Sequence, residues 1–134
     1  MRFEVTKPNK NYKNSFRDEF DDRIYKYMLE LVKFIDNLPR DTVCRVVGGQ
    51  LLRSGTSAGA NYFEAKSSSS KREYINYFQI SLKSANESKI WLRLLKDSGK
   101  CKSDKLDWLL DETNQIGKVL ASSILTMKGK RNLN

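Results

Sequence analysis

Apolar residues recur every three or four positions through most of this chain, which is the spacing of amphipathic α-helices. Short polar breaks divide the pattern into four stretches. The stretches predict helices over residues 16–38, 41–65, 71–97 and 104–128. Four helices of this length joined by short loops favour antiparallel neighbours. The pattern therefore predicts an all-α fold, an up-down-up-down antiparallel four-helix bundle.

The polar breaks also contain residues that commonly start helices. Asp41 is a suitable N-cap for the second predicted helix, and Ser103 or Asp104 for the fourth. Residues 1–15 and 129–134 are polar and basic. We expect them to form a flexible arm and a tail that stay outside the core.

Glycines inside the second predicted helix are unusual, because each costs roughly 0.8 to 1 kcal/mol relative to alanine in a helix interior. Gly55 and Gly59 belong to a run of small residues, residues 55–60. Such a run lets a neighbouring backbone approach closely, and we expect that role here. A phosphate-binding Walker loop is the alternative, but no Gly-Lys-Ser/Thr follows the run and no strand precedes it.

The size and hydropathy of the chain limit its class. It has 134 residues, enough for one domain with a real core, and its mean hydropathy is −0.63. No window approaches eighteen consecutive apolar residues, so we expect no membrane partner. The N-terminus lacks the apolar segment of a secretory signal. We therefore expect a cytoplasmic protein.

The residue types that most often carry out catalysis are scarce. The chain has no histidine, which removes the commonest general base and every Ser-His or Cys-His nucleophile. Its two cysteines, Cys44 and Cys101, lie far apart and have no metal-ligand spacing. We expect no metal, no cofactor and no enzymatic activity.

Two segments carry a resemblance to a known family: residues 54–65 (SGTSAGANYFEA) and residues 81–95 (SLKSANESKIWLRLL). In these segments the chain resembles the four-helix bundle proteins encoded in intervening sequences of 23S ribosomal RNA genes, the S23 family. It is also similar to the accessory variability-determinant proteins of diversity-generating retroelements. The resemblance implies a homopentamer around a central channel, with a basic surface for nucleic acid and no enzymatic activity.

The family signature in these segments consists of polar and small residues: Ser54, Gly55, Ser57, Gly59, Asn61, Glu64 and Glu87. Helical spacing places the polar ones of the second helix along one line, and Ser84 lies near Glu87 on the third. A hydrogen-bonded network that fixes the register of the two helices accounts for this line. The alternative pairs Glu64 with Glu87 as acid and base, although no nucleophile accompanies them.

The third predicted helix has a second apolar stripe beside its core face. Ile80, Trp91 and Leu94 belong to it. Two apolar stripes on one helix indicate two packing partners, so we expect an interface between subunits of a homo-oligomer. A broad core face is the alternative.

Basic residues outnumber acidic residues by 25 to 16, which gives a net charge of +9. Residues 66–105 hold ten of the basic residues and four of the acidic ones. The ten are Lys66, Lys71, Arg72, Lys83, Lys89, Arg93, Lys96, Lys100, Lys102 and Lys105. We predict that they bind the backbone of RNA or DNA with little sequence preference.

The excess of positive charge is also consistent with a protein that binds no nucleic acid. A solvated charged surface accounts for the same residues without any ligand. The chain is then an oligomeric scaffold that holds a protein partner, for example a reverse transcriptase in the retroelement relatives.

Overall fold

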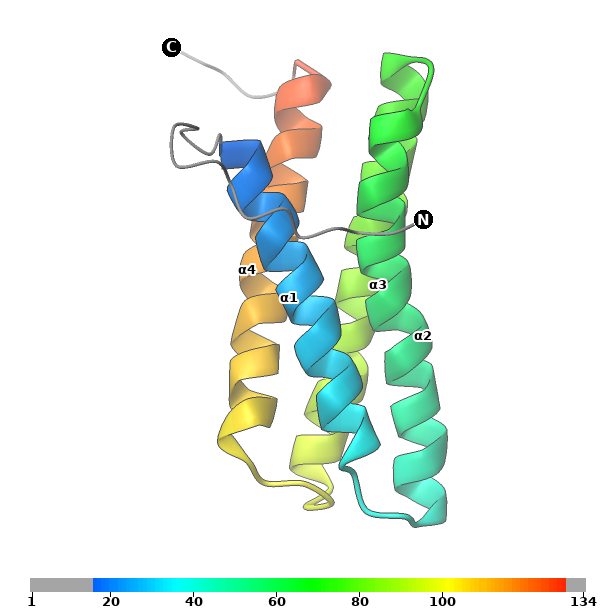
Figure 1. Ribbon diagram of the computed structural model, residues 1–134, viewed down its shortest axis with the longest axis vertical. Coiled ribbons are helices and arrows are strands. Elements are labelled where there is room, and N and C mark those ends of the chain that lie inside the picture. Colours follow the sequence, from blue (N-terminus) through cyan, green and yellow to red (C-terminus); the bar gives the residue numbers. More distant parts are fainter. Residues whose placement is uncertain (1–15, 130–134) are drawn as a thin grey trace.

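The structure, a computed structural model, describes residues 16–129. Its helices are α1 (Phe16–Asp36), α2 (Thr42–Glu64), the short 3-10 helix η1 (Ala65–Ser67), α3 (Lys71–Asp97) and α4 (Asp104–Met127). There is no strand in the described residues. The long helices alternate in direction, so the predicted all-α, up-down-up-down antiparallel bundle is confirmed (Figure 1). The predicted arm, residues 1–15, and all of the predicted tail except Gly129 lie outside the described residues.

Side chains that precede the helices bind their first free N–H groups. Asp41 accepts a hydrogen bond of 2.8 Å from the N–H of Cys44, and Ser103 accepts one of 3.1 Å from Leu106. These contacts fix where α2 and α4 begin. The first helix ends at Asp36, two residues before its expected end, because Pro39 disfavours the α conformation in the residue before it.

The helices surround one core in the order α1, α2, α3, α4 (Figure 1). Helix α3 packs most extensively, against α2 and α4, and its backbone does not approach that of α1, which lies diagonally across the bundle. The largest fully buried side chains come from all four helices: Ile24, Leu31, Leu51, Leu92, Leu95, Leu106, Leu109, Ile116 and Leu120. None of the described helices is long and apolar enough to span a membrane.

The glycines of α2 make room for α1. A Cβ atom at Gly55 would overlap the side chain of Leu31, and one at Gly59 would overlap Met28. The small-residue run therefore receives side chains of the neighbouring helix. The close approach that we expect of this run occurs toward α3, where the hydroxyl of Ser81 donates a hydrogen bond of 2.6 Å to the backbone carbonyl of Ala58. Toward α1, Leu31 and Met28 fill the space between the two helices.

Candidate nucleic-acid interface

A line of hydroxyl pairs joins α2 to α3. Ser54 and Ser88 lie 2.8 Å apart between their Oγ atoms, and Ser57 and Ser84 lie 3.0 Å apart. Asn61 donates a hydrogen bond of 2.9 Å to the carbonyl of Ser57. Ser54 and Ser88 are fully buried. Since buried polar groups must find partners, this line favours one register of the two helices and presents no free nucleophile.

The two signature glutamates are not neighbours. Glu87 forms an ion pair with Arg53 and accepts a hydrogen bond of 2.9 Å from the indole nitrogen of Trp91. Glu64 is exposed at the end of α2, eleven residues beyond Arg53 and so about 16 Å further along the helix. The structure therefore does not bring the two carboxylates together as an acid and base, and Glu64 does not join the network.

The predicted interface stripe lies at the surface of α3. Ile80 is 38% exposed and Leu94 is 46% exposed, while Trp91 is half-buried. Ile90, which the sequence analysis did not single out, is the most exposed apolar residue of this helix at 60%. The helices of the bundle do not cover this surface. Of the three predicted interface residues, only Trp91 fits the alternative of a broad core face.

A second exposed apolar stripe, which we did not predict, occurs on α1. Tyr25, Leu29 and Val32 are each between 38% and 45% exposed. Their spacing of four and three residues puts them on one face of the helix. The same spacing is visible in the sequence, where these residues fall between the positions of the core stripe. Two diagonally placed helices thus each present apolar side chains to solvent.

Acidic neighbours bind the lysines around the loop between α3 and α4. Lys96 lies 2.7 Å from the carboxylate of Asp107, and Lys105 lies 2.6 Å from that of Glu30. The hydrogen bond to Asp107 raises the pKa of Lys96, and the hydrogen bond from Lys105 lowers the pKa of Glu30. Both shifts favour the charged forms of Lys96 and Glu30, which is the form that each ion pair requires.

Two further predicted cations also have acidic partners. Lys100 lies 3.6 Å from Asp41, and Lys66 forms an ion pair with Asp21. The N–H of Cys44 lowers the pKa of Asp41. Lys102 is exposed and has no ion pair within residues 16–129. Nucleic-acid binding by these lysines stays a prediction, and their carboxylate partners reduce the positive field that they present.

The outer face of α3 differs from the loop end because its cations are unpaired. A spacing of four and three residues aligns Arg72, Asn76, Gln79, Lys83, Asn86, Ile90 and Arg93, and all of them are exposed. The three cations form no ion pair within the described residues. Lys89 is half-buried and Glu87 is already held by Arg53. The face extends for about 30 Å and consists of cations, amides and the exposed Ile90, with no carboxylate aligned on it between Arg72 and Arg93.

A groove of about 940 Å³ adjoins this face where α3 begins and α4 ends. Lys71, Arg72 and Lys128 line it, together with Asn76, Gln79 and one carboxylate, that of Glu73. Lys128 was missed by the sequence analysis, which placed it at the end of the fourth helix without a partner. The predicted antiparallel order brings these two helix ends to the same end of the bundle, but the local sequence does not show which side chains line the space between them. The cations of this groove and of the outer face can both donate to phosphate oxygens.

Metal-binding and nucleophilic groups are not assembled elsewhere in the described residues. They contain no group of three or more Cys, Asp or Glu side chains that could hold a metal ion. Cys44 is buried, and burial raises the pKa of its thiol, which keeps it protonated.

Comparison with known proteins places the chain in a family. The family model described as "23S rRNA-intervening sequence protein" matches residues 21–122. The chain belongs to this family. No curated protein matches it. The resemblance to the S23 proteins is thereby confirmed, whereas the similarity to retroelement accessory proteins stays a prediction.

A solved structure supports the same assignment. It is a protein of unknown function from the S23 ribosomal protein family of Bacteroides thetaiotaomicron. The two chains are 32% identical with a TM-score of 0.71, and the match covers 78% of this chain and 96% of that chain. The family match runs from α1 to α4, so it includes the paired serines between α2 and α3 and the outer face of α3.

Proposed function

We propose that this family member is a cytoplasmic, non-enzymatic homo-oligomer that binds the backbone of nucleic acid, in particular structured RNA, with little sequence preference. The observation that carries the proposal is the outer face of α3. Its cations, Arg72, Lys83 and Arg93, are exposed and unpaired within the described residues, and exposed amides lie between them. Four lysines at the ends of the bundle are held by carboxylates, whereas the three cations of this face have no such partner among the described residues and can attract phosphate.

Low sequence preference is expected from the chemistry of the face. Cations and amides along about 30 Å of a straight helix suit phosphate and ribose oxygens. The described face has no element of a known RNA-binding motif that would read base edges. Phosphate contacts release counterions, so affinity should depend strongly on salt.

Oligomerisation raises the charge available to a polyanion. A ring of three or more subunits needs two different surfaces that meet head to tail. Helices α1 and α3 lie diagonally across the bundle, and each has its own exposed apolar stripe. These stripes support a ring, for which the family resemblance implies five subunits. Five chains of net charge +9 carry about +45.

The test compares two variants with the same loss of charge. One changes Arg72, Lys83 and Arg93 to glutamine, and the control changes the paired Lys96, Lys100 and Lys105 to glutamine. Binding of a labelled RNA hairpin is measured by fluorescence anisotropy at about 50 mM salt, where screening is weak. We expect the first variant to lose at least tenfold more affinity than the control.

Two results would count against the proposal. Equal losses in both variants would show that net charge alone, and no particular face, attracts RNA. A parent protein that binds neither RNA nor DNA would leave the scaffold function, for which the exposed apolar stripe of α1 supplies a surface for a protein partner.

A further inference from the structure

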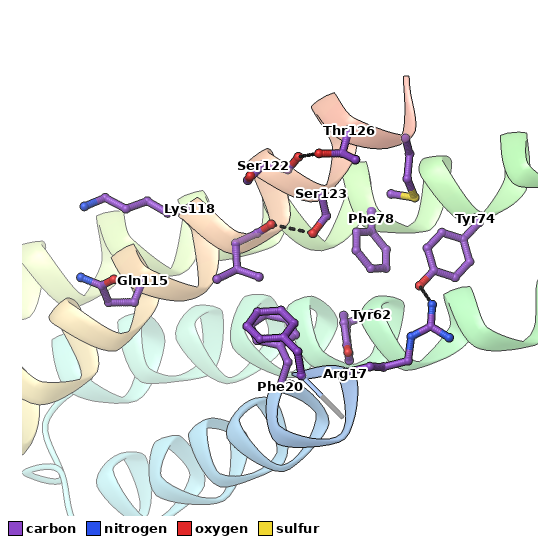
Figure 2. A pocket seen from close by; sticks show the side chains of 13 residues that line it. Arg17, Phe20, Tyr62, Tyr74, Phe78, Gln115, Lys118, Ser122, Ser123 and Thr126 are labelled. Atoms are coloured by element: carbon purple, nitrogen blue, oxygen red, sulfur yellow. Dashed lines mark hydrogen bonds between the residues drawn. The ribbon is translucent and has the colours of Figure 1, made fainter. Parts of the chain in front are cut away.

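A cavity of about 530 Å³ opens between the first turns of α1 and the last half of α4 (Figure 2). Its floor is formed by Phe20, Tyr62 and Phe78, which are all buried. Cavities of this size commonly hold small organic ligands. Two hydrogen bonds between helices, from Arg17 to Tyr74 and from Tyr62 to Asp21, lie at its edge and leave the space between them open.

Aromatic rings dominate the lining. Phe20 and Tyr62 meet edge to face with centroids 5.1 Å apart, and Tyr74 stacks on Phe78 at 4.8 Å. Phe16 lies at the mouth, nearly parallel to Phe20, and is 72% exposed. A flat ring that enters the cavity can therefore contact aromatic surfaces and cover Phe16.

The charged groups of the lining are all positive. Arg17 and Lys118 line the cavity, and none of the described residues that line it is acidic (Figure 2). Arg17 donates a hydrogen bond of 3.4 Å to the hydroxyl of Tyr74. Asp21 lies behind the floor, where it accepts from Tyr62 and pairs with Lys66, so its charge is compensated. The lining thus suits a ligand with a negative group.

Polar atoms on the α4 wall face the same space. The hydroxyls of Ser123 and Thr126 donate to the carbonyls of Val119 and Ser122, which leaves their oxygen lone pairs as acceptors. Gln115 also lines the wall. An alkyl chain would leave these groups without new partners, whereas a ring with N–H groups would bind them.

We propose that this cavity binds the base of an unpaired nucleotide, whose phosphate is held by Arg17 or Lys118. This inference rests on the proposed nucleic-acid binding and adds a second mode to it. The cavity and the basic groove are close along the chain, because Tyr74 and Met127 line one while their neighbours Ile75 and Lys128 line the other. An RNA held in the groove can thus reach the cavity through a bulged or terminal nucleotide.

The first experiment uses two RNAs that contain 2-aminopurine, one with the probe in a single-nucleotide bulge and one with it paired in a duplex. Stacking on aromatic side chains quenches this base. We expect quenching by the parent protein for the bulged probe only. Phe16→Ala should weaken binding of the bulged RNA about tenfold and leave the duplex unchanged, since base stacking on one aromatic ring is worth about that much.

Two control variants separate stacking from other effects. Phe16→Tyr keeps the ring and should retain the quenching. Leu125→Ala truncates an exposed apolar residue of α4 that does not line the cavity, and should bind both RNAs as the parent does. Equal affinity of Phe16→Ala and the parent for the bulged RNA would overturn the proposal.

A second experiment separates this inference from the proposed function. Adenosine monophosphate is titrated into the parent while the methyl signal of Met127 is followed by NMR. A shift that is lost in Phe16→Ala supports the cavity as a nucleotide site, even if no RNA binds. RNA binding without quenching and without this shift would refute the cavity site and leave binding to the outer face of α3 intact.

Discussion

Tyr27 of α1 donates a hydrogen bond of 2.6 Å to the hydroxyl of Thr113 on α4. The direction follows from the second contact of Thr113, whose only hydroxyl proton goes to the carbonyl of Leu109 at 2.6 Å. Both side chains are buried, with exposures of 2% and 3%. This pair is a buried polar link between the first and last helices of the bundle.

The Tyr27 pair predicts a loss of stability in alkali. Burial raises the pKa of Tyr27 from 10.0 to about 12. The folded chain therefore holds this proton more tightly than the unfolded chain, and the stabilisation is complete below about pH 10 and lost as the pH rises to about 12. The loss should amount to about 2 to 3 kcal/mol. Urea unfolding at pH 8 and at about pH 11.5 measures it.

Tyr27→Phe is the matched control for this titration. It removes the ionisable hydroxyl but leaves Thr113 bonded to Leu109. Lysines titrate in the same pH range in both proteins, so only the difference between parent and variant reports on Tyr27. An equal fall in stability in the two proteins would contradict the assignment.

Alanine in place of a glycine of α2 should lower the stability of the protein at two positions and raise it at a third. Gly55→Ala should destabilise the protein by about 1 to 3 kcal/mol, because its Cβ overlaps Leu31, which is fully buried and cannot move aside. Gly59→Ala should cost less, since Met28 is flexible and half-buried. Gly49→Ala meets nothing within 4 Å and should stabilise α2 by up to about 1 kcal/mol. Thermal unfolding of the three variants checks the order.

The fold follows from the sequence because each helix has its own apolar periodicity, and the polar breaks contain capping residues. Asp41 and Ser103 are recognisable N-caps, and both bind the N–H three residues ahead. The serine line of α2 is also visible as a spacing pattern. Its partner Ser88 is not, because the sequence does not reveal the register of α3 against α2.

The distribution of free charge is less predictable. Lys105 pairs with Glu30, which is 75 positions away, and Lys100 pairs with Asp41. Such pairs depend on which helix ends meet. The amino-acid composition alone therefore does not distinguish these paired lysines from the unpaired Arg72 and Lys83. The cavity behind Phe16 is hidden for the same reason, since all four long helices contribute to it.

Oligomer formation is tested best at Leu94. A glutamate there would place a charge in the exposed stripe of α3 and should reduce the mass in sedimentation equilibrium, which we expect to be near five chains for the parent. Leu94→Glu is cleaner than a change at Trp91, whose indole binds Glu87 inside the monomer. Leu125→Glu, at a residue of α4 with nearly equal exposure, should leave the mass unchanged. A monomeric parent at micromolar concentration would exclude the ring.

The dependence of RNA affinity on salt gives a count of the phosphate contacts. Each phosphate neutralised by a cation lowers the slope of log K against log salt by about 0.7 for single strands and 0.9 for duplexes. If Arg72, Lys83 and Arg93 each contact one phosphate, their joint change to glutamine should make the slope less steep by about 2 to 3 for each subunit that contacts the RNA.

A variant at the paired lysines serves as the control for this slope of log K against log salt. Lys96, Lys100 and Lys105 are held by Asp107, Asp41 and Glu30, so their change to glutamine exchanges an internal ion pair for a free carboxylate. This variant should bind more weakly through its lower net charge, yet its slope should stay close to that of the parent because no counterion-releasing contact is lost. Measurements of anisotropy from about 50 to 300 mM salt distinguish the two effects. A slope that changes equally in both variants would mean that the ion pairs open when RNA binds, and that the loop end of the bundle contacts phosphate as well.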